Sequence, residues 1–146
     1  MSPVFVDTNV PMYAGGGPHP VRDAAQRAIL ALATGEIDGV TDAEVFQEIL
    51  YRYLHIGDRV RGFRIFDDFY RIMAGRILPV EAADTYQARM LADHYTGLSP
   101  RDLIHLAVAR RHGISEIMTA DRGFDAVSEI RRLDLSEFLA PDEPDG

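Results

Sequence analysis

Two kinds of hydrophobic pattern alternate along the chain. Short runs that are almost wholly apolar, such as residues 3–6 and 115–120, have the length and composition of strands buried on both faces. Longer segments carry apolar residues every three or four positions, which predicts amphipathic helices. The predicted strands are residues 3–6, 35–40, 76–80, 115–120 and 130–135, and the predicted helices are 21–32, 41–55, 58–73, 81–95 and 99–113.

Strands that alternate with helices indicate a parallel sheet covered by helices on both faces. We therefore predict an α/β fold, a three-layer α/β/α sandwich with a short, mostly parallel central sheet. The chain has 146 residues, of which 47% are hydrophobic, enough for one compact domain with its own core. We place that domain at residues 1–139, and we expect the Pro-rich acidic end, residues 140–146, to be disordered.

Composition excludes several kinds of chemistry. The chain has no cysteine, which rules out disulfides, thiolate metal sites and a cysteine nucleophile. All 15 basic residues are arginine, so a phosphate-binding P-loop, a Schiff-base enzyme and the phospho-receiver fold are disfavoured, because each relies on a lysine. No segment has the pattern of a transmembrane helix or a signal peptide, so we expect a cytoplasmic protein with no membrane partner.

Charge is unevenly distributed. The formal net charge is −8, which argues against a generic nucleic-acid-binding protein. Three of the acidic residues, however, lie in the last seven positions. Residues 52–76 have the opposite balance, with six arginines against three aspartates, and could face an anionic partner.

Two aspartates follow apolar strands. Asp7 comes directly after residues 4–6, and Asp121 comes after residues 116–120. In a parallel sheet the carboxyl ends of the strands share one edge, where ligand sites form. An aspartate after a strand is also a good helix N-cap, which explains either residue alone. Because two aspartates follow strands at this same edge, a functional site explains them as well as helix capping does.

Three more acidic residues lie on predicted helices. Glu44 stands three residues after Thr41, so "TDAE" is predicted to be a capping box that accounts for Glu44. Glu48 lies beyond the reach of any cap, beside the apolar face of its helix, and is the better site candidate. Asp102 stands three residues after Ser99, so it has a capping explanation, but its position also brings it close to the strand edge.

Together, Asp7, Glu48, Asp102 and Asp121 could converge on one edge of the sheet. Crowded carboxylates repel one another, and a divalent cation relieves that repulsion. Mg²⁺ or Mn²⁺ prefers such oxygen ligands and supports hydrolysis of a phosphate ester. Asp125 lies four residues after Asp121, and on a helical turn the two would face the same side. His105 lies within a mostly apolar helix, so we expect a packed histidine rather than a ligand.

Four ordered motifs resemble the PIN-domain ribonucleases, in particular the VapC-type toxins of toxin–antitoxin pairs. The motifs are "VDTNV", "VFQEILYRY", "LSPRDLIHLAVARRHGI" and "IMTADRGFD", and the resemblance extends from residue 4 to about 135. It implies that the four acids named above hold Mg²⁺ or Mn²⁺ for endonucleolytic cleavage of RNA. It also implies that Asn9 and Thr119 orient water or carboxylates, and that Asp125 is an acidic position found in some members.

The resemblance implies partners as well: an RNA substrate, a homodimer, and an antitoxin whose C-terminal segment wraps the toxin. Because the chain lacks lysine, arginines must make every cationic phosphate contact, to which their bidentate fork is suited. Arg101 and Arg122 each adjoin a predicted ligand and are the stronger candidates. Arg59, Arg61 and Arg64 could contact RNA or the antitoxin, or form a solvated helix face.

Two other functions compete with this interpretation. A phosphatase of the haloacid-dehalogenase type also begins with an aspartate after its first strand, but it needs a second aspartate where this chain has Asn9, and it needs a lysine. A PIN-like module that binds RNA or protein without cleavage is the stronger alternative. Such a module would be expected to lack one or more of the acids, and all four are present.

Overall fold

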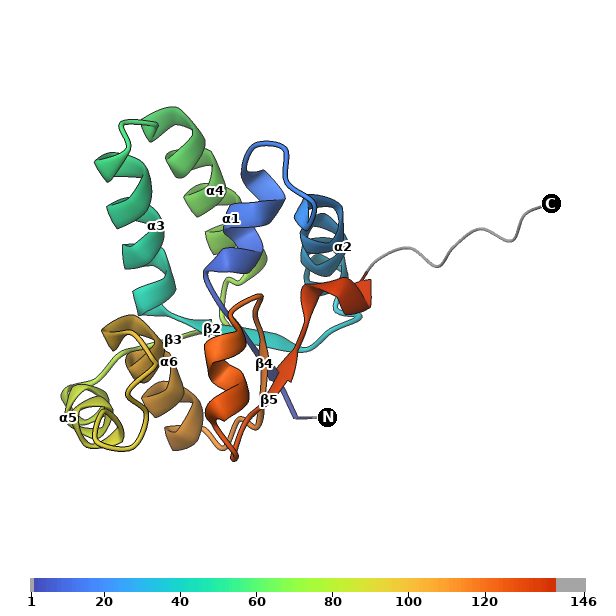
Figure 1. The fold of residues 1–146 in the computed structure, drawn as a ribbon. Coiled ribbons are helices and arrows are strands. Elements are labelled where there is room, and N and C mark those ends of the chain that lie inside the picture. Colours follow the sequence, from blue (N-terminus) through green and yellow to red (C-terminus); the bar gives the residue numbers. More distant parts are fainter. Residues whose placement is uncertain (1, 139–146) are drawn as a thin grey trace.

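The central sheet has five parallel strands in the order β3-β2-β1-β4-β5 (Figure 1). In this computed structural model, which describes residues 2–138, the strands are β1 (Val4–Val6), β2 (Gly39–Asp42), β3 (Ile77–Leu78), β4 (Glu116–Met118) and β5 (Arg131–Leu133). The predicted parallel sheet is confirmed. The disordered tail predicted at residues 140–146 lies outside the described residues.

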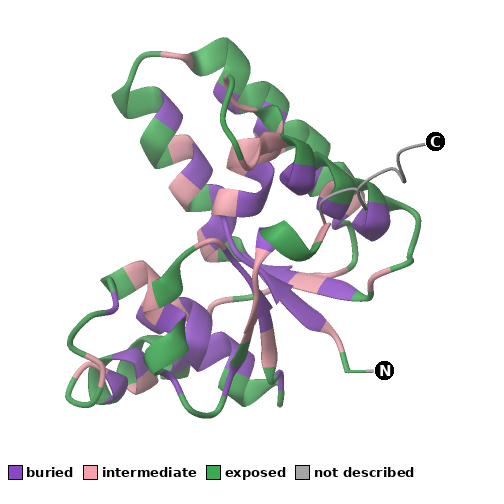
Figure 2. Ribbon diagram, turned by 45° about the vertical axis from the view of Figure 1, so that its right-hand side comes forward, coloured by how far each residue is buried: buried purple, intermediate pink, exposed green. Residues whose placement is uncertain are grey.

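Helices cover both faces of the sheet, which confirms the three-layer α/β/α class. The helices are α1 (Asn9–Gly15), α2 (Arg22–Ala33), α3 (Ala43–His55), α4 (Arg59–Ile72), α5 (Ala82–Leu91) and α6 (Pro100–Arg111), with short 3₁₀ helices η1 (Arg122–Ala126) and η2 (Leu135–Phe138). One core lies between the sheet and α1–α4, and a second lies between the sheet and α5, α6 and η1 (Figure 1). Buried residues accordingly line the sheet and the helix sides that face it (Figure 2).

Strand β1 joins the two cores. Its residues are all buried, as the apolar run predicts. Because successive side chains of a strand point to opposite faces, Val4 and Val6 belong to the core under α1–α4, whereas Phe5 belongs to the other. The strand is thereby fixed from both sides, and the residue that follows it, Asp7, is held at the carboxyl edge of the sheet.

Helix α1 is an element that the hydrophobic pattern does not predict. It has only seven residues, and none of them belongs to a predicted strand or helix. Pro11 sits in its first turn, where a missing N–H is tolerated, and is buried together with Val10. A helix of two turns is too short to display a clear period in the sequence, so its existence depends on packing.

The predicted capping box at Thr41 and Glu44 is wrong. Thr41 belongs to β2, where its Oγ1 donates a hydrogen bond of 2.9 Å to the carbonyl of Val6. Asp42 is the N-cap of α3 and accepts a bond of 3.1 Å from the backbone N–H of Val45. The tertiary bond to β1 keeps Thr41 extended, which moves the helix start one residue along the chain.

The start of α6 follows its prediction. Ser99 is the N-cap and accepts a hydrogen bond of 3.2 Å from the backbone N–H of Asp102, and Pro100 occupies the first helical position. The Asp102 carboxylate therefore projects from the first turn of α6. This helix also carries His105 one turn further on, on the same side.

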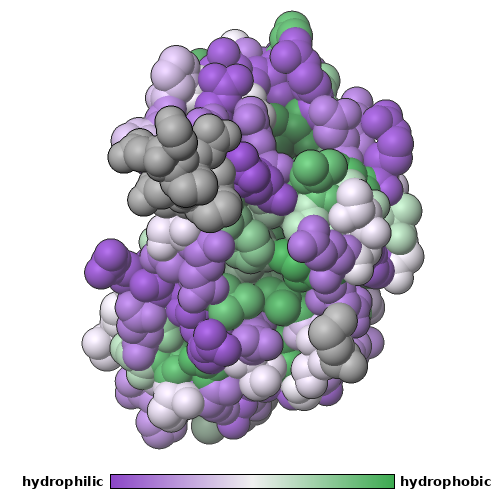
Figure 3. All heavy atoms as spheres, turned by 90° about the vertical axis from the view of Figure 1, so that its right-hand side faces the viewer, coloured by the Kyte–Doolittle hydropathy of each residue, from purple (hydrophilic) through white to green (hydrophobic). Residues whose placement is uncertain are grey.

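The aromatic residues of α4 are divided between core and surface. Phe69 is buried, while Phe63 and Tyr70 are exposed. On the face of the molecule drawn in Figure 3, hydrophobic residues gather between mostly hydrophilic ones.

Within residues 2–138, none of the helices combines the length and apolar character needed to cross a bilayer.

Candidate metal centre

Asp7 lies buried at the end of β1, with only 4% of its surface exposed. The backbone N–H of Thr8 donates to its Oδ1 at 2.7 Å, and the Thr119 hydroxyl donates to its Oδ2 at 2.7 Å. Burial raises the pKa of Asp7, although the nearby positive charge of His105 and the two hydrogen bonds act in the opposite direction. Both carboxylate oxygens are thus fixed in position by groups that follow β1 and β4.

Asn9 and Thr119 connect the ends of these two strands. Asn9 donates from Nδ2 to Thr119 Oγ1 at 2.9 Å, and its Oδ1 accepts from the backbone N–H of Ala120 at 3.2 Å. Thr119 Oγ1 also accepts from the backbone N–H of Asp121 at 3.0 Å. Through these bonds one threonine hydroxyl connects Asp7 to the turn that carries Asp121.

Glu48 reaches this edge from α3. Its Oε2 accepts a hydrogen bond from the Thr8 hydroxyl, and its Oε1 lies 3.5 Å from Nη1 of Arg101. Burial alone would raise the pKa of Glu48, but the bond from Thr8 and the positive charges of His105 and Arg101 outweigh it and lower the pKa. Glu48 therefore has the tertiary contacts that its position in the sequence did not reveal.

His105 is fully buried, as predicted, but it belongs to the site. Its Nδ1 lies 2.8 Å from Oδ2 of Asp42, which is itself fully buried. Its Nε2 is 3.7 Å from Asp7 and 3.8 Å from Glu48, and has no hydrogen-bond partner within residues 2–138. Burial alone would lower the pKa of His105, yet the charge of Asp42 and the bond to it raise the pKa well above the usual value.

Asp102 and Asp121 are the other two predicted acids. Burial and the negative charges of Asp7 and Asp121 raise the pKa of Asp102 to about 6. Asp121 is exposed and caps η1, accepting a bond of 2.8 Å from the backbone N–H of Gly123. Asp102 thus lies in the first turn of α6 and Asp121 at the start of η1.

The arrangement suits a divalent cation. One ligand atom each from Asp7, Glu48 and His105 lies within 4.8 Å of the others. Since Nδ1 of His105 faces Asp42, only its Nε2 faces Asp7 and Glu48, and carboxylate oxygens are the more numerous ligand atoms in the group. An oxygen-rich set of this kind favours a hard cation such as Mg²⁺ or Mn²⁺ over a metal that prefers nitrogen or sulfur.

Asp125 is held away from this cluster. Arg132 donates to both of its carboxylate oxygens, at 2.8 and 3.3 Å. The bonds to Arg132 lower the pKa of Asp125. The prediction that Asp121 and Asp125 share a helical face assumed an α-helical turn, whereas η1 is a 3₁₀ helix with three residues per turn.

Of the five predicted RNA-contacting arginines, Arg61 and Arg101 line the same cavity, and the other three do not line it. Arg101 pairs with Glu48, and its guanidinium lies 4.5 Å from the centre of the Tyr51 ring. Arg122 is exposed beside Asp121. Arg61 lines a cavity next to the acidic edge, Arg64 lines a different cavity, and Arg59 lies over the Phe63 ring.

Asp42 and His105 are site residues that the sequence did not assign. A signal for Asp42 was present, because it ends β2 just as Asp7 ends β1. The capping pattern at Thr41 concealed it. His105 could be recognised only once α6 was placed against β1 and β2.

Comparison with known proteins identifies the class. Residues 4–130 match the family model of the PIN domain, so the chain belongs to the PIN-domain family. VapC ribonuclease Mb1869c of Mycobacterium bovis is 41% identical over 130 residues, which cover 89% of this chain and 98% of that protein. Ribonuclease VapC23 of Mycobacterium tuberculosis is 40% identical over 119 residues, covering 81% and 92%. Within that family the chain belongs with these VapC ribonucleases.

Solved structures share the fold at lower identity. The crystal structure of Mycobacterium tuberculosis VapC20, described as a toxin that cleaves the sarcin–ricin loop, has a TM-score of 0.69 and 20% identity, covering 87% of this chain and 96% of that one. FitAcB from Neisseria gonorrhoeae has a TM-score of 0.68 and 20% identity, covering 91% and 98%. At these identities the similarity establishes the fold alone.

Proposed function

We propose that Asp7, Glu48, Asp102 and Asp121 hold Mg²⁺ or Mn²⁺, and that the protein uses this site to cut RNA internally as the toxin of a toxin–antitoxin pair. The observation that carries the proposal is the cluster at the carboxyl edge of the sheet, where ligand atoms of Asp7, Glu48 and His105 lie within 4.8 Å of one another. The negative charge of Glu48 acts to raise the pKa of Asp7. Charges that repel each other in this way are stabilised by a cation.

A bound divalent cation supplies charge neutralisation at the phosphodiester and activation of a water molecule. The chain's own residues prepare the site for it. Thr119 and the backbone N–H of Thr8 fix the two oxygens of Asp7, and the Thr8 hydroxyl fixes Glu48. Because metal ligands depend on such supporting hydrogen bonds for their orientation, these contacts hold the carboxylates in place before the cation arrives.

Arg101 and Arg122 would contact the phosphate groups next to the scissile bond. Each is adjacent in sequence to a proposed ligand, and Arg101 already lies beside Glu48. A guanidinium binds a phosphate through two parallel N–H donors, which suits a chain without lysine. Asp125 is not included among the ligands, since Arg132 occupies both of its oxygens.

The proposal extends to partners and place of action. One solved relative of this fold is described as a toxin–antitoxin complex from Klebsiella pneumoniae, with a TM-score of 0.60. By analogy we propose a homodimer that is inhibited by an antitoxin and acts on RNA in the cytoplasm. Co-purification with the protein encoded by the adjacent reading frame would support this part of the proposal.

The decisive experiment is cleavage of a mixed RNA pool by the purified protein. We expect internal cleavage with Mg²⁺ or Mn²⁺, none with EDTA, and a loss of at least about a hundredfold in Asp7→Asn, as is typical when a catalytic contact is removed. Asp23→Asn, at an exposed position of α2, is the matched control and should cleave normally.

Metal binding separates the alternatives if no cleavage is seen. Calorimetry with Mn²⁺ should give one affinity for the wild-type chain and a much weaker one for Asp7→Asn. An inert protein that binds neither Mg²⁺ nor Mn²⁺ would refute the catalytic proposal and leave a non-catalytic RNA- or protein-binding module. An inert protein that binds metal through Asp7 would retain the site and require a more selective RNA target.

A further inference from the structure

The turn that carries Asp121, residues 119–125, is attached at both ends to one side chain of the neighbouring strand. Arg132 lies on β5, which pairs with β4, and its side chain is only 10% exposed. Its Nη1 donates to the backbone carbonyl of Thr119 at 3.3 Å, where the turn begins. Its Nε and Nη2 donate to the two carboxylate oxygens of Asp125, at 2.8 and 3.3 Å. Asp121 lies between these two points of attachment.

A second carboxylate, that of Asp134, fixes the guanidinium of Arg132. Nη1 of Arg132 donates to Oδ2 of Asp134 at 2.6 Å, and Oδ1 of Asp134 accepts from the backbone N–H of Ser136 at 2.9 Å. The bonds from Ser136 and Arg132 lower the pKa of Asp134 to about 2, so this carboxylate is ionised at neutral pH. Because charge-assisted bonds to a planar guanidinium are directional, the two aspartates together fix its orientation.

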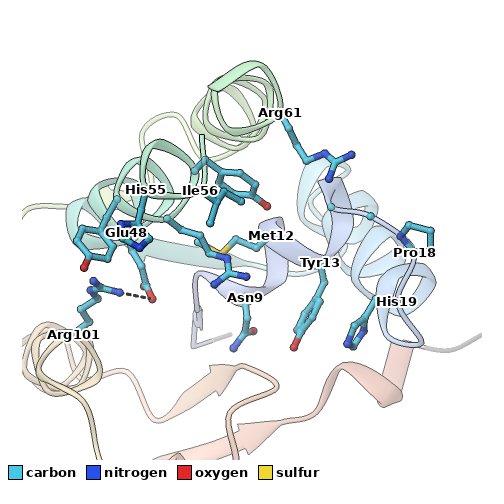
Figure 4. Close-up of a pocket in the computed structure, with 15 residues that line it drawn as sticks. Asn9, Met12, Tyr13, Pro18, His19, Glu48, His55, Ile56, Arg61 and Arg101 are labelled. Carbon is cyan, nitrogen blue, oxygen red and sulfur yellow. Dashed lines mark hydrogen bonds and ion pairs between the residues drawn. The ribbon is translucent and has the colours of Figure 1, made fainter. Parts of the chain in front are cut away.

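Arg132 is not available to bind a substrate phosphate. All three of its guanidinium nitrogens donate hydrogen bonds within the protein. Arg101 differs, because within residues 2–138 it contacts one carboxylate, that of Glu48, at the edge of the proposed metal site (Figure 4). Any effect of Arg132 on the reaction therefore passes through the residues that it holds.

The first residue of the turn belongs to the hydrogen-bond network of the proposed metal site. The hydroxyl of Thr119 donates to Asp7 and accepts from the backbone N–H of Asp121. Phe124, which is fully buried, anchors the middle of η1 in the core. Arg132 adds a direct connection between the two ends of the turn, since it bonds both to the Thr119 carbonyl and to Asp125.

We propose that Arg132 is a positioning residue for the metal site. By tying Asp125 to the carbonyl of Thr119, it holds Asp121 where its carboxylate can bind the cation. The inference rests on the proposed function, in which Asp121 is a metal ligand. It also gives Asp125 a role, because Asp125 supports the site through Arg132 without being a ligand. Removing a supporting contact of a metal ligand typically costs about 10–100-fold in metal affinity.

Mn²⁺ binding by Arg132→Met separates positioning from simple electrostatics. The guanidinium is a positive charge that repels a cation, so its removal alone would strengthen Mn²⁺ binding. If Arg132 positions Asp121, we expect the opposite result, a loss of Mn²⁺ affinity of about tenfold by calorimetry. Arg132→Lys keeps the charge but lacks the planar fork, so it should also bind Mn²⁺ more weakly. This variant decides the question if Arg132→Met does not fold.

A double-mutant cycle tests whether the effect passes through Asp121. Asp121→Asn should itself weaken Mn²⁺ binding. Adding Arg132→Met to it should change the affinity by less than about twofold, because the ligand that Arg132 positions is already absent. Arg131→Met is the matched control, since the side chain of Arg131 is 71% exposed and pairs with Glu116, and it should bind Mn²⁺ normally.

Hydrogen–deuterium exchange of the metal-free protein gives a readout that does not depend on Mn²⁺. In Arg132→Met the backbone amides of residues 119–126 should exchange at least about tenfold faster, as expected when charge-assisted hydrogen bonds that close a local segment are lost. The amides of α3 and α6 should exchange as in the wild type, which would show that the rest of the fold is intact.

The outcomes distinguish this inference from the proposed function. Undiminished Mn²⁺ binding in both Arg132 variants, an equal loss with and without the Asp121 carboxylate, or unchanged exchange of residues 119–126 would each overturn the inference. If Asp121→Asn bound Mn²⁺ like the wild type, Asp121 would not be a ligand, and that part of the proposed function would be wrong as well. The cleavage experiment would still stand by itself, since it depends on Asp7.

Discussion

Replacing Asp102 with asparagine should stabilise the metal-free protein and destabilise the metal-loaded one. In the folded chain the pKa of Asp102 is raised from 3.8 to about 6, first by burial and then by the charges of Asp7 and Asp121. The folded state therefore holds the proton more tightly than the unfolded chain does. The contribution of Asp102 to the free energy of unfolding is therefore fully present below about pH 4 and is lost as the pH rises through about 6. At pH 8 the ionised carboxylate of Asp102 lowers the free energy of unfolding, and Asp102→Asn removes this destabilisation.

The size of the effect follows from the pKa difference. About two pKa units correspond to roughly 3 kcal/mol. Asp102 is only partly buried, so solvent screening reduces this to about 1–2 kcal/mol. Its position in the first turn of α6 acts the other way, because a carboxylate near a helix N-terminus is favourable by about 0.3–1 kcal/mol. The net expectation is a gain of about 1 kcal/mol, or roughly 3 °C in melting temperature for a chain of this size.

Thermal unfolding followed by circular dichroism would measure this difference. In EDTA at pH 8 the variant should melt higher than the wild type, and near pH 4 the difference should be mostly absent. With Mg²⁺ at 100 times its dissociation constant the wild type gains about 2.7 kcal/mol, which the variant should largely forgo. Asp67→Asn, at an exposed position of α4, is the control. A variant that melted lower than the wild type in EDTA at pH 8 would refute the electrostatic reasoning.

Three further predictions test the supports of the site and the fold. His105→Ala should lower the free energy of unfolding by about 3 kcal/mol, because it leaves the buried carboxylate of Asp42 without its partner. In urea unfolding the double variant with Asp42→Asn should recover part of that loss, and no recovery would contradict the pairing. Thr119→Val should weaken Mn²⁺ binding at least about tenfold by calorimetry, because it removes the donor to Asp7 Oδ2 while keeping the side-chain shape. Gly62→Ala should cost about 1–3 kcal/mol, because its Cβ would lie 2.3 Å from the Cβ of a tyrosine in α3. Gly97→Ala, where no atom lies within 4 Å of the added Cβ, should be close to neutral in the same urea experiment.

The hydrophobic pattern was sufficient to predict the three-layer architecture of the fold. Strands β1 and β4 and five of the six α-helices lie where apolar spacing predicts them, because burial on two faces and burial on one face leave different periods in the sequence. Helix α1 left no such period and was missed. In α5 the buried side chains do not follow apolar character alone, since Tyr86 and Met90 are exposed, while Asp84 is buried and bonded to Arg111.

The sequence by itself determined which residues could form an acidic site, because motif order and strand ends identify positions without coordinates. From the sequence alone, Asp42 was interpreted as part of an ordinary helix start and His105 as an ordinary core residue. Only the tertiary structure brought them together, since they are 63 residues apart and meet where α6 packs beside β1 and β2. The local hydrophobic pattern predicts each helix or strand separately, whereas a site depends on which elements lie next to one another. Long-range packing determines that arrangement.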